Sequence, residues 1–484
     1  MKLRNIFKLQ KLYYLFFVRQ VLSVGILKEK LFRVVLLLMG LVLFGYFLWS
    51  HYDGFDGMLV RPDVDWENTL IRGRITTDMM WTMLAFILIK LLFLKKGSFL
   101  KMTAQLPVTN RERSLSLLVF EMVLVFVIVA MMSAAYGLAF IWRFNAGDVW
   151  LLLSANFFTI TTLYLTLQLG YVLLSYLLGR VSFSKLKVIF TYLALLSAVI
   201  WIQLEIGRFA MRFIDRGGYP YEGFHWSILF VWLHDEVHEL TPIIVFLTFV
   251  SLSVFLILKI PNQVYVEEQS YMNIRIPFMK RPTLVHLYLL QLVRRVENTV
   301  TLLASTGLFI FFMVDPIMRQ EMNPFNTFVL LGTLGVYVYI QTDCIRLLLY
   351  RFNYNGWQDY GALIVSQVLY LLLVTIPLLV VHWLVRREGT LLLYINGFSS
   401  PLMTMLMATC GGILFPAKKE NPFSSFMGMM LTGIVMLFLI YVNGFLNLSP
   451  LATILVRGVF VILVILISVM GLIKLKEVVQ HETH

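Results

Sequence analysis

The chain has 484 residues, of which 59% are hydrophobic and 14% are charged. Soluble domains are about 45–50% apolar and about 25% charged, so these proportions exclude an ordinary soluble protein and indicate a membrane protein. The formal net charge of +13 does not indicate nucleic-acid binding, because the basic residues lie mainly in short segments between apolar runs, where they act as topology signals. The apolar runs are continuous rather than alternating, which predicts helices and excludes a transmembrane barrel.

About twelve apolar runs are long enough for a transmembrane helix, which needs roughly 20 residues. The predicted spans are 31–50, 79–95, 115–142, 149–178, 188–204, 242–260, 299–318, 325–345, 361–384, 390–415, 425–445 and 451–473. The predicted fold is therefore all-α and polytopic. The two cysteines, Cys344 and Cys410, both fall in apolar runs, and we expect buried free thiols.

The distribution of basic residues predicts the orientation of the chain. With the N-terminus inside, the cytoplasmic segments contain 28 of the 40 Lys and Arg residues. Cytoplasmic loops are enriched in Lys and Arg, so both termini are predicted to be cytoplasmic and the protein to be a multi-pass protein of the cell membrane. The first outer loop, predicted at 51–78, is acidic and agrees with this orientation.

The layout of the spans predicts two halves, 1–260 and 261–484, each with about six helices that start from the cytoplasmic side. Each half begins with a basic amphipathic stretch. The first contains Arg19, Lys28, Lys30 and Arg33, and the second runs from Leu284 to Asn298. Such stretches lie flat at the headgroup boundary with Lys and Arg near anionic lipid, so membrane lipids are predicted partners.

The inner loop between the second and third spans contains a rigid turn. Pro107 disfavours helix in the residue before it, and Thr109 or Asn110 can cap the next helix. Arg111, Glu112 and Arg113 follow as a charged helix start. A short, charged and capped turn at the membrane surface suits docking to a soluble partner, and the alternative is a plain topological loop.

This loop carries a resemblance to the permease subunits of ABC-2-type exporters. The matching residues are Leu106, Pro107, Val108, Thr109, Arg111, Glu112 and Arg113. The resemblance implies that this loop and the preceding surface helix contact a separate ATP-binding-cassette subunit. The corresponding loop of the second half lacks Leu-Pro and turns at Asn355-Gly356, followed by Trp357 and Asp359, so it is a weaker counterpart.

The chain lacks the G-x-x-x-x-G-K-[ST] loop that cradles ATP phosphates. ATP and Mg²⁺ are therefore expected on a partner ATPase, with no cofactor on this chain. No arrangement typical of a soluble enzyme is visible in the sequence, and we expect a transport subunit rather than an enzyme.

Charges inside the predicted spans are costly, by roughly 2.5–3.5 kcal/mol on insertion scales, and usually face protein or water. The candidates are Lys90, Glu121, Asp343 and Arg457. Each either pairs with another group or lines a substrate path. Lys90 lies near an inner helix end, where its side chain could extend to the membrane boundary.

The outer loop 205–241 contains His234 and His238, four residues apart. On one helix both imidazoles would share a face, as metal-binding pairs do. The alternative, which the sequence favours, is a surface helix that packs Trp226, Phe230 and Leu233 against the bilayer.

These observations favour the permease of an ATP-driven exporter, which works by alternating access on an amphipathic peptide, lipid or drug. A self-sufficient lipid-linked oligosaccharide flippase or secondary transporter is the alternative, and it would need a cationic central cavity. A third hypothesis is a membrane-embedded enzyme that acts at the outer face through His234 and His238.

Overall fold

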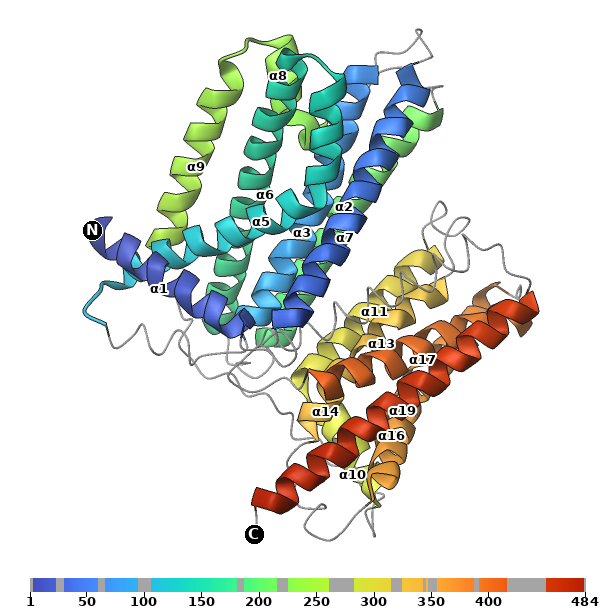
Figure 1. Ribbon diagram of the computed structural model, residues 1–484. Helices are drawn as coiled ribbons and strands as arrows, with labels where there is room; N and C mark the ends of the chain where they lie inside the picture. Colours follow the sequence, from blue (N-terminus) through green and yellow to red (C-terminus); the bar gives the residue numbers. More distant parts are fainter. Residues whose placement is uncertain are drawn as a thin grey trace. The chain divides into compact units, whose positions relative to one another are not determined.

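The computed structural model describes residues 3–22, 30–59, 66–94, 106–180, 187–215, 225–260, 283–314, 324–342, 345–346, 355–386, 391–415 and 450–482. The regular elements in these residues are helices (Figure 1). Five of them are long and apolar enough to cross a membrane: α5 (Asn110–Arg143), α6 (Ala146–Arg180), α9 (Thr241–Lys259), α16 (Gly356–Arg386) and α17 (Leu391–Leu414). The chain is therefore an α-helical membrane protein.

Helices also occupy other predicted spans. They are α2 (Lys30–Leu59), α3 (Trp66–Leu94), α7 (Lys187–Asp215), α11 (Val296–Val314) and α19 (Pro450–Glu482). The predicted span 325–345 is broken into three short pieces, η3 (Pro324–Phe328), α13 (Val329–Thr333) and α14 (Gly335–Gln341). The predicted span 425–445 lies outside the described residues. The total number of crossings stays a prediction.

Contacts within the chain divide it into two compact units. Unit 1 comprises residues 1–19 and 27–267, and unit 2 comprises residues 20–26 and 268–484. Unit 1 contains the helices up to α9, and unit 2 begins its helices with α10 (Leu284–Arg294). This division does not test whether 1–260 and 261–484 are structural repeats, so the predicted repeat stays a prediction.

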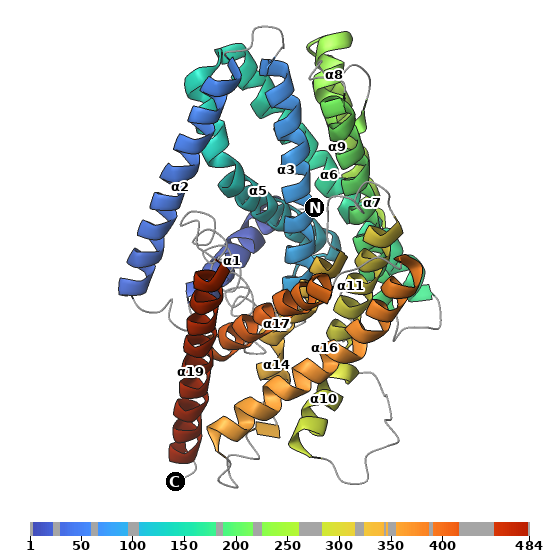
Figure 2. The same cartoon turned by 90° about the vertical axis from the view of Figure 1, so that its right-hand side faces the viewer.

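In unit 1, α5 lies between α2 and α3 and packs against both (Figure 2). Helix α6 packs against α3 and α9. The core between α3, α5 and α6 contains Phe86, Phe120 and Tyr164, each at most 1% exposed. Helix α1 (Leu3–Leu22) crosses the other helices of this unit instead of running alongside them (Figure 1).

In unit 2, α17 packs against α13, α14 and α19. Glycines make the contact between α14 and α17 possible. A Cβ atom on Gly412 would lie 2.5 Å from the carbonyl oxygen of Val336, and one on Gly335 would lie 2.7 Å from that of Met405. Only a residue without a side chain lets the two backbones approach this closely, as at helix interfaces in membranes.

Three helices extend into predicted outer loops, and the first is α2, which continues to Leu59. Helix α3 begins at Trp66, so Arg72, Arg74 and Asp78 are helical and the predicted loop 51–78 is wrong. The Arg74–Asp78 ion pair, one helical turn apart, makes this polar segment compatible with a helix. Helix α7 likewise continues to Asp215 and includes Arg208, which pairs with Glu205.

Candidate functional site

The turn before α5 is closed by backbone and side-chain hydrogen bonds. The Val108 amide donates to the Leu106 carbonyl at 2.8 Å, around Pro107. Thr109 is the N-cap: its hydroxyl accepts from the Glu112 amide at 3.3 Å, while the Glu112 carboxylate accepts from the Thr109 amide at 3.1 Å. This reciprocal capping box fixes the first turn of the helix.

The charged residues of this turn face different ways. Glu112 and Arg113 are 3% and 6% exposed, and Arg113 donates to the Asn110 side chain at 2.9 Å. Arg113 of the predicted charged helix start is therefore buried and does not belong to the exposed face of the turn. Leu106, Pro107 and Arg111 are exposed. The face that is available to a partner consists of these three residues together with the exposed Thr109.

Helix α1 packs against the first turns of α5. The Asn5 amide group donates to Glu112 at 3.3 Å, and the Ser116 hydroxyl donates to the Ile6 carbonyl at 3.0 Å. Tyr13, Tyr14 and Phe17 surround the ring of Phe120, with centroids 5.1 to 6.0 Å away. Burial raises the pKa of the Tyr14 phenol. The exposed face of the turn is therefore held on a base that packing and hydrogen bonds make rigid.

The predicted counterpart of this turn in the second half differs from it, because its acidic residue is buried. Helix α16 begins at Gly356, and Asp359 in its first turn is 1% exposed. The Tyr288 hydroxyl of α10 donates to this carboxylate at 2.6 Å, and Arg346 Nε donates to it at 2.8 Å. Only Asn355 and Trp357 of the four predicted residues are exposed. Asp359 is therefore an internal partner and is not available for docking.

Arg346 is enclosed completely. Its other nitrogens donate to the Tyr339 carbonyl and the Thr342 hydroxyl, both at 2.8 Å, and its guanidinium lies 4.2 Å from the Tyr339 ring centroid. Arg346 was missed among the candidate residues because it falls in a predicted loop. Nothing local in the sequence shows that Asp359, which Tyr288 also binds, meets Arg346.

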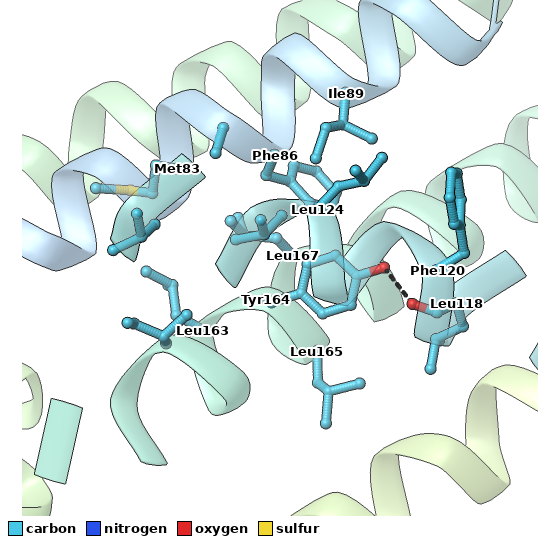
Figure 3. Close-up of a cluster of buried hydrophobic side chains, with 14 of the residues drawn as sticks. Met83, Phe86, Ile89, Leu118, Phe120, Leu124, Leu163, Tyr164, Leu165 and Leu167 are labelled. Carbon is cyan, nitrogen blue, oxygen red and sulfur yellow. Dashed lines mark hydrogen bonds between the residues drawn. The ribbon is translucent and has the colours of Figure 1, made fainter. Parts of the chain in front are cut away.

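Lys90 and Glu121 form a buried ion pair. Their Nζ and Oε2 atoms are 2.6 Å apart, and the two side chains are 5% and 3% exposed. The Tyr164 hydroxyl donates to Glu121 at 3.1 Å and to the Leu118 carbonyl at 3.2 Å. Figure 3 shows this phenol among the apolar side chains of the core. Lys90 therefore does not extend to the membrane boundary. Asp343 and the Arg457 side chain lie outside the described residues.

A second polar cluster lies in unit 1 and was missed. Asp78 is fully buried and accepts two bonds from Arg74, at 2.7 and 3.1 Å. Ser133 and Asn156 each donate to the same carboxylate at 2.6 Å. The four-residue spacing of Arg74 and Asp78 was the available signal, because such pairs are neighbours on a helix.

His234 and His238 do not share a helix face. Helix α8 (Leu229–Glu236) ends before His238, so the geometric basis of the metal hypothesis is wrong. His234 lies 3.3 Å from Asp235, which also binds Arg72 at 3.0 Å. Among the described residues, no group of three or more metal-ligating side chains is present.

The apolar residues around α8 pack within the protein rather than against the bilayer. Phe230 is 4% and Leu233 is 9% exposed, and the Phe230 ring contacts Phe158 and Phe246. Trp226 is partly buried against the core of unit 1. The segment is therefore attached to unit 1 by this apolar contact and by the Arg72–Asp235 pair.

No family model, curated protein or solved structure matches this chain.

Proposed function

We propose that this chain is the membrane-spanning permease subunit of an ATP-driven exporter. In this proposal about twelve spans form two repeats of about six helices, with both termini in the cytoplasm. A separate ATP-binding-cassette subunit supplies ATP hydrolysis. The substrate is an amphipathic peptide, lipid or drug that enters from the cytoplasm or the inner leaflet.

The observation that supports this proposal is the capped turn at 106–109 on its rigid base. Leu106, Pro107 and Arg111 form a small exposed face, while Glu112 and Arg113 are used internally. Helix α5 has 34 residues, which corresponds to about 51 Å at about 1.5 Å per residue. A push on the turn would therefore be transmitted along a continuous helix that also contains Glu121 and reaches both polar clusters.

The buried pair Lys90–Glu121 also bears on the flippase alternative. That class needs a cationic interior to attract an anionic substrate. Lys90 is neutralised by Glu121 at 2.6 Å, and Arg74 is neutralised by Asp78 at 2.7 Å. The paired state of these two cations supports the exporter over the flippase.

The test uses the exposed residue Arg111. The tagged chain is purified from its host membranes in mild detergent, and ATP hydrolysis of the purified material is measured. Arg111→Glu and Leu106→Glu should each abolish the co-purifying ATPase activity, because they place a carboxylate on the proposed contact face. The matched control is Lys259→Glu, an exposed charge reversal at the end of α9.

The control and the wild type should retain the activity, and all variants should keep the wild-type melting temperature. ATPase activity that co-purifies equally with Arg111→Glu and the wild type would contradict the docking role. The absence of ATPase activity from the wild-type preparation would contradict the exporter proposal itself.

Topology can be tested separately with reporter fusions. Fusions at Lys101, at Tyr271 and at the C-terminus should report a cytoplasmic location, and one at Asp63 an external location. An external signal at Tyr271 would contradict the division into two parallel repeats, because the two halves would then start from opposite sides of the membrane.

A further inference from the structure

Helix α1 is held in one rotational orientation. Ile6, Leu9 and Tyr13 are 7%, 2% and 0% exposed and form a stripe against α5. The Ser116 hydroxyl bonds to the Ile6 carbonyl in the middle of this contact. Because the buried stripe is fixed, the opposite face of α1 is also fixed.

The opposite face combines cations with large apolar side chains. All four cations of the helix, Arg4, Lys8, Lys11 and Arg19, are exposed, and the helix contains no acidic residue. The exposed apolar side chains are Phe7 at 69%, Leu12 at 45%, Leu15 at 56% and Val18 at 48%. Water solvates such apolar side chains poorly, so a fully aqueous environment does not suit this face.

Spacing places both kinds of side chain in one stripe. Arg4, Lys8, Lys11, Leu15 and Val18 follow one another at intervals of three or four residues, which are neighbours on a helix surface. Helix α1 crosses the helices of unit 1 (Figure 1), so it can lie in the plane of a bilayer that those helices cross. A basic and apolar face in that orientation is typical of helices that lie in the interface of anionic membranes.

We propose that the exposed face of α1 binds the anionic headgroups of phospholipids, with Phe7, Leu12, Leu15 and Val18 below the headgroup level. Lys and Arg bind phosphate oxygens through charge-assisted hydrogen bonds. The large apolar side chains between the cations favour a bilayer over an acidic protein surface, because only the bilayer offers acyl chains beneath the negative charges. This inference is independent of the exporter proposal.

The test measures the environment of a label on α1 in the full-length protein. Leu15→Cys is introduced with Cys344→Ser and Cys410→Ser and labelled with an environment-sensitive fluorophore. The protein is placed in nanodiscs of phosphatidylcholine, with or without phosphatidylglycerol. The reference position is Val237→Cys, an exposed apolar residue beyond α8 that is 55% exposed. Quenching by headgroup-attached nitroxide lipid and by neutral acrylamide in water is compared.

With phosphatidylglycerol, the label at residue 15 should be quenched more by the lipid nitroxide and less by acrylamide. The label at residue 237 should not respond to lipid charge. Lys8→Gln with Lys11→Gln should remove most of the response, because each cation near an anionic surface favours binding about fivefold. Both lysines are exposed, so the melting temperature should not change.

Equal quenching at residue 15 in both lipid compositions would overturn the proposal. So would a response that persists in the Lys8→Gln, Lys11→Gln variant. A label that acrylamide reaches in both nanodiscs, and that is protected only in native membranes, would show that a protein covers this face, which also overturns the proposal.

Discussion

Unit 1 and unit 2 each bury a cation against a carboxylate of a long helix, but the two cations are held differently. Among the described residues Lys90 donates to Glu121, and its ammonium lies 5.0 Å from the centroid of the Tyr171 ring. Arg346 donates to Asp359, to a backbone carbonyl and to a hydroxyl, and stacks on Tyr339. The planar guanidinium of arginine binds several partners at once in a fixed geometry, whereas the ammonium of lysine is a point charge on a flexible stem. Arg346 is therefore held more rigidly than Lys90, as is Arg74 of unit 1, which donates twice to Asp78.

The glycines follow the same contrast. Gly40, Gly45, Gly54, Gly73, Gly137, Gly147 and Gly170 of unit 1 have no neighbouring atom within 4 Å of an added Cβ. In unit 2, Gly332, Gly335 and Gly412 lie against the backbone of a neighbouring helix. These glycines of unit 1 face open space, as Gly307, Gly361 and Gly458 of unit 2 also do, while direct backbone contact defines the spacing between α14 and α17. Four substitutions test this contrast.

The largest effect is expected from Asp359→Ala. It leaves Arg346 charged and buried without its carboxylate, and removing one partner of a buried ion pair destabilises by about 3–5 kcal/mol. The thermal unfolding midpoint in detergent should fall sharply, and the Tyr288 hydroxyl loses its acceptor as well. Asp359→Glu should recover part of the loss. An unchanged midpoint for the alanine variant would show that Arg346 has a different environment.

A smaller loss, near the lower end of the same range at about 3 kcal/mol, is expected from Glu121→Gln. The amide oxygen of the new glutamine can still accept a hydrogen bond from Lys90, whereas alanine at residue 359 offers Arg346 no acceptor. The double variant Lys90→Met, Glu121→Gln should recover most of the stability, because no unpaired charge remains. A full double-mutant cycle of unfolding midpoints measures the coupling. Additive effects would mean that the two groups do not form a pair.

Gly412→Ala should destabilise by about 1–3 kcal/mol, since the new methyl group forces α17 and α14 apart. The control is Gly137→Ala in α5, which has open space around it. That change should stabilise by about 0.5–1 kcal/mol, because alanine favours a helix interior over glycine. If both variants shift the thermal unfolding midpoint by the same amount and in the same direction, the contrast between the close contact at Gly412 and the open space at Gly137 is wrong.

The smallest effect is expected from Thr109→Ala, at about 1 kcal/mol, the typical loss for an N-cap hydroxyl. Thr109→Ser keeps the oxygen and should retain the stability. In the ATPase co-purification assay, Thr109→Ala should reduce the recovered activity less than Arg111→Glu does, because it loosens the turn without reversing a charge. A larger reduction than that of Arg111→Glu would indicate that Thr109 contacts the partner directly.

The sequence by itself determined the helical membrane character and a capped turn at Thr109 or Asn110, and the structure selects Thr109. A long apolar run must form a helix in lipid because its backbone groups have no other partners. The cap depends on Thr109 and Glu112, which are three residues apart, so local rules were sufficient. The turn chemistry of Pro107 is equally local.

Only the tertiary structure decided which polar groups meet. Lys90 and Glu121 are 31 residues apart, Asn5 and Glu112 are 107 apart, and Arg72 and Asp235 are 163 apart. Hydropathy and helical periodicity describe each segment separately, and they do not state which faces of two distant helices pack together. The burial of Arg113, the extension of α3 through Arg74 and Asp78, and the enclosure of Arg346 depend on such packing. Charge counting placed these residues at the surface because it had no information about the partners that the fold brings to them.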